Sequence, residues 1–433
     1  MLEIIGSSVL GLLWEILGNA PQQQVLLESS WNNSAIFELP PEEFDPAVQD
    51  IVDNYLQNLS QQGIDKDKQS VWLQSDWIEL GSHRGKIPVS AASLTKIATT
   101  LAALGKLGVD HQFVTQIYHT GFIKDGVLEG DLVVKGDRDP FFVWEEAIAL
   151  SNTLNQLGIK EITGDLLIGD RFYMNYQYQP TVAGKLLKQG LEPRLWSSEV
   201  KQQFSALPIT TPRPQLTIKG EVKQIDKLPT DAQPLIAHKS LPLMAILRQM
   251  NIYSNNEMAQ MLADIAGGAA AVADYAVAAT KVTPSEIQLI NGSGLGVENR
   301  ISPRAAAKML MAIENLLQPH NLQITDIFPV AGRDEVGTME NRNLPPGVAI
   351  KTGTLNQVSA LAGTIPLNSD RKIWFAVINS GWQIPKFRQQ QDELLQDLAD
   401  RWQLNPQLTD TFPENRVYLG DPQRNQIDDR LQL

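Results

Sequence analysis

Residues 90–108 read SAASLTKIATTLAALGKLG and predict a helix that the rest of the chain must bury. Apolar side chains recur in it at helical spacing and would bury one stripe of a helix, at Leu94, Ile97, Leu101 and Leu104. Gly105 and Gly108 are well placed to end that helix. Ser93 and Lys96 stand three residues apart at its start, so a hydroxyl and an amine share one helical face. This pair is either an ordinary helix start or a nucleophile with its base.

The chemical interpretation of Ser93 and Lys96 follows from their position. The amide groups of a helix N-terminus stabilise a negative charge that forms beside them. A lysine that is desolvated, or lies near another cation, loses its proton more easily and can activate a serine. The spacing alone is a weak signal, because Ser198 and Lys201 repeat it. Prolines in QQFSALPITTPRP follow this second copy and break a long helix, so only Ser93 is expected to open a buried helix.

Composition limits the classes of function. The chain has 433 residues, of which 43% are hydrophobic and 20% charged, as is typical of a folded protein with two domains. A net charge of −13 without a basic run argues against binding of nucleic acid or anionic lipid. The absence of cysteine excludes disulfides, zinc–thiolate sites and cysteine nucleophiles. The five histidines show no chelating spacing, so no metal centre is expected.

The composition and the spacing of apolar and turn-forming residues change along the chain, and these changes predict its domains. Residues 1–24 hold an apolar run flanked by glutamates, which fits a degenerate signal sequence or an amphipathic helix. We expect residues 25–110 and 237–404 to form one helix-and-sheet domain that is split in sequence. Residues 111–236, with short β-like runs joined by Gly and Asp turns, predict a β-rich inserted domain that holds one helix. Residues 405–433 predict a polar tail of low order.

A second motif is Ser254-Asn255-Asn256, in the sequence YSNNE. Its hydroxyl and carboxamide groups are suited to relay a proton and to hold a substrate amide. The same stretch has a structural interpretation, because Ser254 and Glu257 have the spacing of a capping box before a helix at Met258. Both interpretations can hold together.

A third motif is Lys351-Thr352-Gly353, in AIKTGTL. On a strand that flanks a cleft, the lysine offers a cation and the threonine a hydroxyl to a substrate carboxylate, while the glycine lets a ligand approach the backbone. The alternative is a lysine that protects an edge strand, followed by a bend. The stretches VAIKTGTLNQVSALAGTI and RKIWFAVINSGW predict adjacent antiparallel strands that are apolar enough to be buried.

The order of the three motifs is more specific than any one of them. Ser-x-x-Lys, Ser-x-Asn and Lys-Thr-Gly, in that order, are shared by penicillin-binding proteins and serine β-lactamases. From about Val71 to Ser380 the chain resembles the D-Ala-D-Ala carboxypeptidase/endopeptidases, the class C group of low-molecular-mass penicillin-binding proteins. The long gap between Lys96 and Ser254 fits that family, whose domain is interrupted. The resemblance is carried by SLTKIATTLAALGKLGVDHQFVTQI, SLPLMAILRQMNIYSNNEMAQML, INGSGLGVENRISPRAAAKML and VAIKTGTLNQVSALAGTI.

The resemblance implies an α+β fold, in which a β-lactamase/transpeptidase-like domain, an antiparallel sheet packed with helices, is interrupted by a β-rich inserted domain. It also implies acyl transfer without a metal or organic cofactor. Ser93 would attack the carbonyl between the two terminal D-alanines of a peptidoglycan stem peptide, and Lys96 would accept its proton. Ser254 and Asn256 would pass that proton to the leaving group and orient the peptide.

The resemblance further implies how the substrate is held. Lys351 and Thr352 would bind its terminal carboxylate, Gly353 would leave room for it, and the backbone N–H groups of Ser93 and Thr354 would form the oxyanion hole. The implied partners are peptidoglycan stem peptides and β-lactam antibiotics, which would acylate the same serine. Because peptidoglycan lies outside the cytoplasmic membrane, the implied location is periplasmic or otherwise extracytoplasmic. From the sequence itself, residues 1–24 are the one segment suited to contact a membrane.

Two other functions stay open from the sequence. One is a serine β-lactamase, although the chain has no E-x-x-L-N element. The other is a non-catalytic peptidoglycan-binding relative, against which the intact set of motifs argues. The chain departs from the family at Ala91, where proline is frequent, and at Asn291, where aspartate is frequent. Its insert is short for the family, which predicts that a third small domain is missing or reduced.

Overall fold

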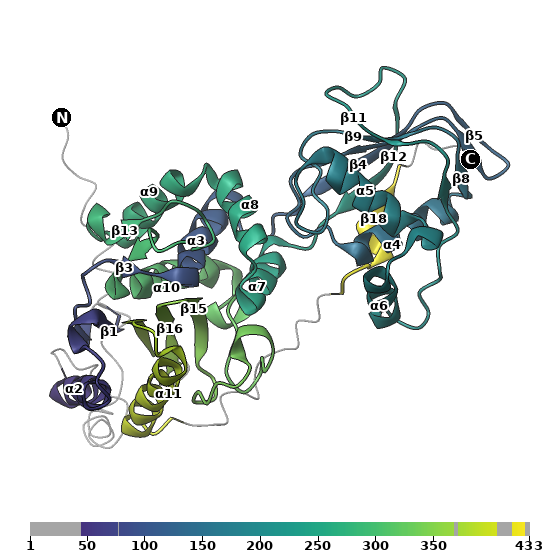
Figure 1. The fold of residues 1–433 in the computed structure, drawn as a ribbon. Coiled ribbons are helices and arrows are strands. Elements are labelled where there is room, and N and C mark those ends of the chain that lie inside the picture. The colour runs from purple at the N-terminus through teal and green to yellow at the C-terminus, as the bar shows by residue number, and fades with distance from the viewer. Residues whose placement is uncertain (1–44, 77, 368–370, 405–417, 429–433) are drawn as a thin grey trace, which may run out of the picture. The chain divides into compact units, whose positions relative to one another are not determined.

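The computed structural model describes residues 45–76, 78–367, 371–404 and 418–428 (Figure 1). The apolar segment 1–24 lies outside the described residues. The α-helices are α2 (Pro46–Gln61), α3 (Thr95–Leu107), α4 (Trp144–Gln156), α5 (Pro180–Leu191), α6 (Ser198–Ala206), α7 (Leu243–Tyr253), α8 (Asn256–Ala266), α9 (Ala269–Thr280), α10 (Pro303–Leu317) and α11 (Ile384–Arg401).

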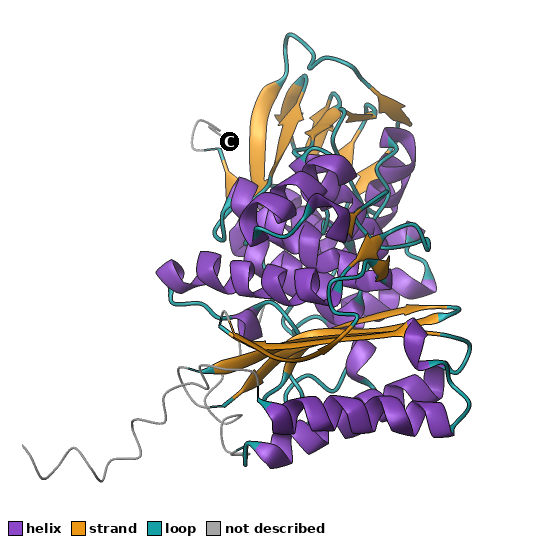
Figure 2. Ribbon diagram, turned by 90° about the vertical axis from the view of Figure 1, so that its left-hand side faces the viewer, coloured by secondary structure: helices purple, strands orange, loops and turns teal. Residues whose placement is uncertain are grey.

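A five-stranded antiparallel sheet organises one part of the chain. Its order is β15 (Ala349–Leu355), β16 (Val358–Pro366), β17 (Lys372–Ser380), β1 (Gln69–Ser75) and β2 (Ile78–His83). The side chains of β17 alternate between two apolar cores: Ile373, Phe375 and Val377 enter one, and Trp374, Ala376 and Ile378 enter the other. Figure 2 shows the sheet edge-on with helices on both of its faces. The predicted adjacent, buried, antiparallel strands are therefore confirmed.

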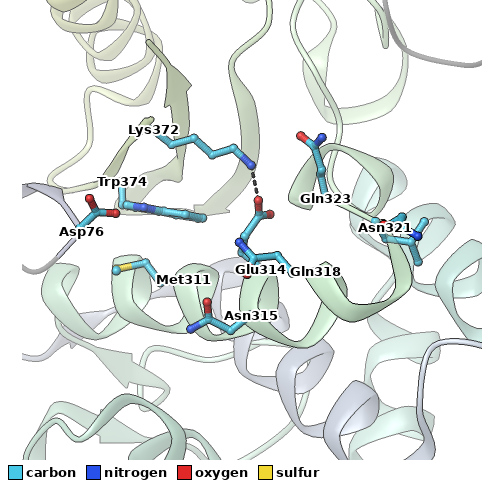
Figure 3. Close-up of a pocket in the computed structure, with 10 residues that line it drawn as sticks. Asp76, Met311, Glu314, Asn315, Gln318, Asn321, Gln323, Lys372 and Trp374 are labelled. Carbon is cyan, nitrogen blue, oxygen red and sulfur yellow. Dashed lines mark hydrogen bonds and ion pairs between the residues drawn. The ribbon is translucent and has the colours of Figure 1, made fainter. Parts of the chain in front are cut away.

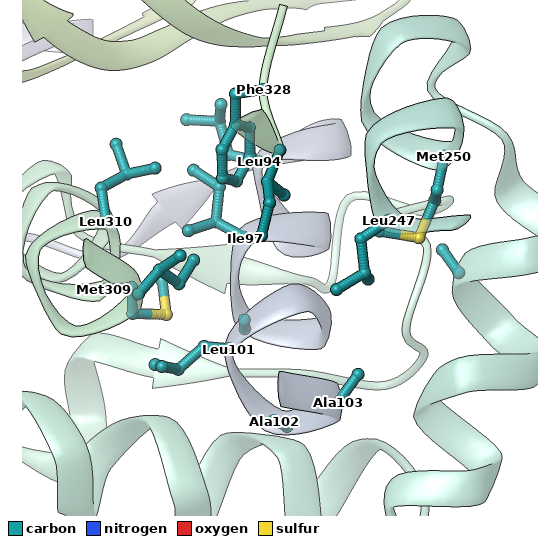
Figure 4. Close-up of a cluster of buried hydrophobic side chains, with 14 of the residues drawn as sticks. Leu94, Ile97, Leu101, Ala102, Ala103, Leu247, Met250, Met309, Leu310 and Phe328 are labelled. Atoms are coloured by element: carbon teal, nitrogen blue, oxygen red, sulfur yellow. The ribbon is translucent and has the colours of Figure 1, made fainter. Parts of the chain in front are cut away.

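Helix α3 lies inside the core on one face of this sheet. The predicted apolar stripe is buried and packs among side chains of α7 and α10 (Figure 4). Burial goes beyond that stripe, because every residue from Thr95 to Leu104 is buried. A helix surrounded by protein has no solvent-facing side for a lysine, so Lys96 is carried into the interior with the rest.

The opposite face of the sheet is covered by α2 and α11. Val48, Val52 and Leu59 of α2 join the same core as Phe387 and Leu395 of α11. A small three-stranded sheet, with the order β13 (Ile287–Gln288), β14 (Arg300–Ile301) and β3 (Val89–Ser90), lies elsewhere in this part of the chain. Its strand β3 runs directly into Ser93, so the residues before the predicted nucleophile are fixed by strand pairing.

Among the described residues, no single helix has both the length and the apolar composition to cross a membrane. Helices α8 and α9 satisfy that test only as a pair, across a bend of 76°.

A second group of strands has an apolar core of its own. Its six-stranded sheet has the order β11 (Val222–Gln224), β9 (Leu166–Ile168), β7 (Leu132–Lys135), β4 (Val114–His119), β12 (Gln233–Lys239) and β18 (Asn425–Ile427). Its four-stranded sheet has the order β10 (Thr217–Ile218), β8 (Glu161–Ile162), β6 (Val127–Glu129) and β5 (Phe122–Lys124).

The structure differs from the sequence prediction for the insert in its helices. Beside α4 it contains α5 and α6, which were not expected. Two glycines of α5 allow close packing: a Cβ on Gly184 would lie 2.5 Å from Ile168, and one on Gly190 would lie 2.7 Å from Ala147. Helix α6 begins at Ser198, the serine of the second Ser-x-x-Lys copy.

The strand ladder also extends past the predicted C-terminal limit of the insert. Strand β12 crosses the expected boundary between residues 236 and 237, and β18 comes from the segment that was expected to be a polar tail of low order. The polar tail residue Asn425 is buried because His238 and Thr153 offer it hydrogen-bond partners. A polar side chain with buried polar partners gives no sign of burial in the sequence.

We predict that the C-terminal segment is stabilised by a buried ion pair. Arg424 Nη2 donates to Glu146 Oε1 at 2.5 Å, and the Glu146 side chain is 1% exposed. The substitution Arg424→Met leaves that carboxylate buried without its cation, so we expect it to lower the free energy of unfolding by about 3–5 kcal/mol, measured by urea unfolding.

The matched control for this prediction is Lys223→Met. Lys223 pairs with Asp165 on the surface, where its side chain is 57% exposed, so this substitution should leave the unfolding midpoint nearly unchanged. Equal effects of the two substitutions would contradict the assigned importance of the buried pair.

Candidate active site

Ser93 lies in a short 3-10 turn, Ala92–Leu94, immediately before α3. The hydroxyl is at the N-terminal end of a buried helix, and the Ser93 residue itself is only partly buried. The preceding residue, Ala92, has a φ of +47°, a left-handed conformation that costs a non-glycine residue about 1–2 kcal/mol. A strained residue next to an accessible hydroxyl is a common feature of catalytic sites.

The amine of Lys96 is the centre of the site. Its Nζ donates to Ser93 Oγ at 3.1 Å, to Asn256 Oδ1 at 2.8 Å and to the carbonyl oxygen of Ser293 at 2.7 Å. Burial lowers the pKa of Lys96 from 10.5 to about 7, against the opposing effect of the Glu257 charge. An amine with a pKa near neutrality, in contact with a serine hydroxyl, is suited to accept its proton.

The second motif lies at the junction of α7 and α8. Ser254 follows α7 in a left-handed conformation, with a φ of +53°, and Asn256 is the first residue of α8. The predicted capping box is wrong: Asn255, not Ser254, caps α8, because its Oδ1 accepts a hydrogen bond from the Met258 amide at 2.9 Å. The left-handed turn directs the Ser254 hydroxyl away from the helix end, toward the third motif.

The third motif lies on β15, an edge strand of the five-stranded sheet. The buried Lys351 donates from Nζ to Ser254 Oγ at 3.1 Å and to the Thr352 carbonyl oxygen at 3.0 Å. Burial, and to a smaller extent the charge of Lys96, holds the pKa of Lys351 well below its usual range. Thr352 is mostly buried and Thr354 is exposed.

Gly353 allows β15 to approach the nucleophile closely. A Cβ at this position would lie 3.0 Å from the Ala91 carbonyl oxygen and 3.1 Å from the Ser93 nitrogen. A larger side chain would therefore push the strand away from the turn that carries Ser93.

The structure thus brings the three motifs together through two lysines. Lys96 contacts Ser93 and Asn256, and Lys351 contacts Ser254. The second Ser-x-x-Lys copy is elsewhere: Ser198 and Lys201 are exposed residues of α6. The stretch His119-Thr120-Gly121, which resembles Lys-Thr-Gly in sequence, begins at the last residue of β4 and is not part of the site.

Sequence reasoning missed a loop that completes the site. The carbonyl oxygen of Ser293 accepts from Lys96, and Gly294, at a φ of +85°, lies so close to the nucleophile turn that a Cβ would be 1.9 Å from the Ala92 carbonyl oxygen. Asn291 Oδ1 holds this loop by accepting from the amides of Ser293 and Gly294. The stretch NGSG, with two glycines beside a polar turn residue, is the signal that could have identified it.

Residues from the segment that was predicted to be the insert line a recess beside the site. This pocket, of about 350 Å³, is lined by Asn256 and Ser293 and by three tyrosines, Tyr173, Tyr176 and Tyr178.

A separate pocket of about 550 Å³ lies between α10 and β17, where Glu314 pairs with Lys372 (Figure 3). It is lined by none of the predicted site residues. Among the described residues, no three His, Asp or Glu side chains form a group that could hold a metal ion.

Comparison with known proteins identifies the family. Residues 73–185 and 181–401 match the D-Ala-D-Ala carboxypeptidase 3 (S13) family. The chain belongs to the S13 family. Its members are serine carboxypeptidases, so this S13 chain is a hydrolase of that class, as the resemblance implied.

Two curated relatives illustrate the range of similarity. The S13 chain is 30% identical over 160 residues to carboxypeptidase DacB of Mycolicibacterium smegmatis, over 33% of this chain and 34% of the relative. It is 23% identical over 402 residues to D-alanyl-D-alanine carboxypeptidase DacB of Haemophilus influenzae, over 70% of this chain and 83% of the relative. The chain thus matches about a third of the first relative and most of the second.

Solved structures show the same fold. A predatory peptidoglycan endopeptidase from Bdellovibrio bacteriovorus matches 83% of this chain and 98% of its own, with a TM-score of 0.68 and 20% identity. Penicillin-binding protein 4 from Haemophilus influenzae matches 80% and 98%, with a TM-score of 0.59 and 20% identity. The expected α+β, transpeptidase-like fold of this S13 chain is therefore confirmed.

We predict that the Lys96 amine titrates near pH 7. Burial disfavours the charged form, so the midpoint should be about 7, measured by NMR of protein labelled with ¹⁵N-lysine. Because the Glu257 charge raises this pKa, Glu257→Gln should move the midpoint to lower pH.

The control for this titration is Glu298→Gln, which removes an exposed carboxylate from the loop after Gly294 and should not move the midpoint. A Lys96 midpoint near the ordinary lysine value of about 10.4 would show that the amine is not desolvated.

Proposed function

We propose that this S13 chain is a serine D-Ala-D-Ala carboxypeptidase/endopeptidase that cleaves peptidoglycan stem peptides through an acyl-enzyme on Ser93 and is inhibited by β-lactams. One observation carries the proposal: the buried Lys96 amine lies 3.1 Å from Ser93 Oγ and 2.8 Å from Asn256 Oδ1. Family membership supplies the substrate class, and a relative of the same fold has been solved with penicillin G bound as an acyl group.

The acylation step follows from this geometry. Lys96 accepts the proton of Ser93 Oγ as that oxygen forms a bond to the carbonyl carbon between the two D-alanines. The negative charge then sits on the carbonyl oxygen, where the backbone N–H groups of Ser93 and Thr354 donate to it. Loss of one such donor costs about a hundredfold or more in turnover. The approach of Gly353 to the Ser93 nitrogen supports this arrangement, because it brings the two backbones side by side.

Release of the leaving group needs a proton on the terminal D-alanine nitrogen. Ser254 Oγ accepts a hydrogen bond from Lys351 Nζ at 3.1 Å. Its hydroxyl is suited to deliver the proton that Lys96 received, and Asn256 to hold the peptide amide. Water then attacks the ester on Ser93, which regenerates the hydroxyl and releases the shortened peptide. When the cleaved bond is a cross-link, the same steps give endopeptidase activity.

The division of the chain and its location are part of the proposal. Separate apolar cores support a catalytic domain interrupted by an insert, and β18 adds a C-terminal strand to the insert's sheet. Because the family's substrate is the cell wall, we propose a periplasmic or otherwise extracytoplasmic location. The tyrosine-lined recess beside Asn256 supports a role of the insert in binding the stem peptide.

The nucleophile is tested by covalent labelling. We expect a fluorescent penicillin to label the chain, Ser93→Ala to abolish the label, and Ser198→Ala to leave it intact, as read from a denaturing gel. Loss of the label in Ser198→Ala alone would refute the assignment. Rapid, repeated hydrolysis of nitrocefin by the wild type would favour the β-lactamase alternative, and peptidoglycan binding without any adduct would favour the non-catalytic one.

The position of Ser93 is tested with two glycines of nearly equal φ. Gly294 has a φ of +85° and a Cβ there would collide with the Ala92 carbonyl, whereas Gly108 has a φ of +83° and open space around it. Gly294→Ala should slow acylation by about a hundredfold, since a shift of about 1 Å in a reacting group has an effect of that size. Gly108→Ala should acylate at the wild-type rate, and equal slowing in both variants would contradict the proposed clash.

A further inference from the structure

We infer that Arg388, on α11, is the cation that binds the terminal carboxylate of the substrate; this inference rests on the proposed function. It starts from one hydrogen bond, in which Arg388 Nη2 donates to Thr354 Oγ1 at 3.0 Å. Thr354 directly follows the Lys-Thr-Gly motif on β15, and both side chains are exposed. An arginine from the last helix thus reaches the strand along which the substrate is expected to lie.

The lysine of the motif is poorly suited to supply this positive charge. Lys351 is fully buried, and its Nζ donates to Ser254 and to the Thr352 carbonyl. Burial and the neighbouring Lys96 hold the pKa of Lys351 well below its usual range, so its charged form is disfavoured. An amine that loses its proton easily and already donates to two partners is better suited to orient Ser254 than to neutralise an incoming carboxylate.

Arg388 has the charge that Lys351 lacks. A guanidinium stays protonated at physiological pH and presents five N–H donors in a planar fork that matches a carboxylate. Among the described residues, no Asp or Glu forms an ion pair with Arg388. Asp392, one helical turn further along α11, is already paired with Arg342 at 2.6 Å. The guanidinium therefore has donors left for a ligand after the hydrogen bond to Thr354.

The strand geometry places the carboxylate close to this guanidinium. Thr352 and Thr354 are two residues apart on β15 and project to the same side of the strand. Gly353, between them, is the point at which β15 meets the Ser93 turn. A carboxylate held by the hydroxyls of Thr352 and Thr354 therefore lies beside the nucleophile. It also lies beside Arg388, which already donates a hydrogen bond to Thr354 Oγ1. A bidentate arginine–carboxylate pair is among the strongest that proteins make.

Two matched peptides test this inference. One ends in D-Ala-D-Ala with a free carboxylate, and the other is the same peptide with a terminal carboxamide. For Arg388→Ala we expect kcat/KM on the free acid to fall about ten- to a hundredfold, mainly through KM, and kcat/KM on the carboxamide to stay within about twofold of wild type. Arg388→Lys should recover part of the activity on the acid. Lys386→Ala, which removes another exposed cation of α11, should leave kcat/KM unchanged on both peptides.

The outcomes separate this inference from the proposed function. An equal loss on both peptides would overturn it, because Arg388 would then act on the fold of β15 rather than on the carboxylate. Unchanged activity on both peptides would overturn it as well. A wild-type protein that cleaves neither peptide and takes no penicillin label would refute the proposed function, and the assignment of Arg388 with it.

Discussion

The burial of one lysine amine is the constraint on which the rest of the site depends. Lys96 sits on a helix that is surrounded by protein, and its ammonium form must give up hydration that only three hydrogen-bond acceptors replace. Those acceptors come from the nucleophile turn, from α8 and from the loop after β13. The same contacts that compensate the buried amine therefore bring three distant segments of the chain to one point.

The site repeats this arrangement with a second lysine. Lys351 is buried on β15 and reaches Ser254 in the way that Lys96 reaches Ser93. Two amines close enough to affect each other cannot both easily keep a proton, which suits a site that moves protons. The exposed Arg388 of α11, which contacts Thr354 on β15, gives the site a permanent positive charge that neither buried lysine provides.

Close backbone approach is the second requirement. The nucleophile turn is confined by Gly353 on one side and Gly294 on the other, and a methyl group at either position would meet the backbone of residues 91–93. The strained φ of Ala92 is held in place by this packing and by the pairing of β3 with β14. The accessible hydroxyl of Ser93 is thus positioned by the backbone around it rather than by its own side-chain contacts alone.

The buried stripe of α3, the antiparallel strands β15 to β17 and the three motifs could be predicted from the sequence, because apolar periodicity and the order of motifs are read along the chain without knowing which distant residues meet. The packing of distant segments decided that Asn255 caps α8 instead of Ser254, and that Ser293 and Gly294 complete the site. It also decided that the polar residue Asn425 is buried in a strand and that Arg388 reaches Thr354. Those results depend on contacts between residues far apart in the chain, and a hydrogen bond between distant side chains leaves no period or spacing in a sequence.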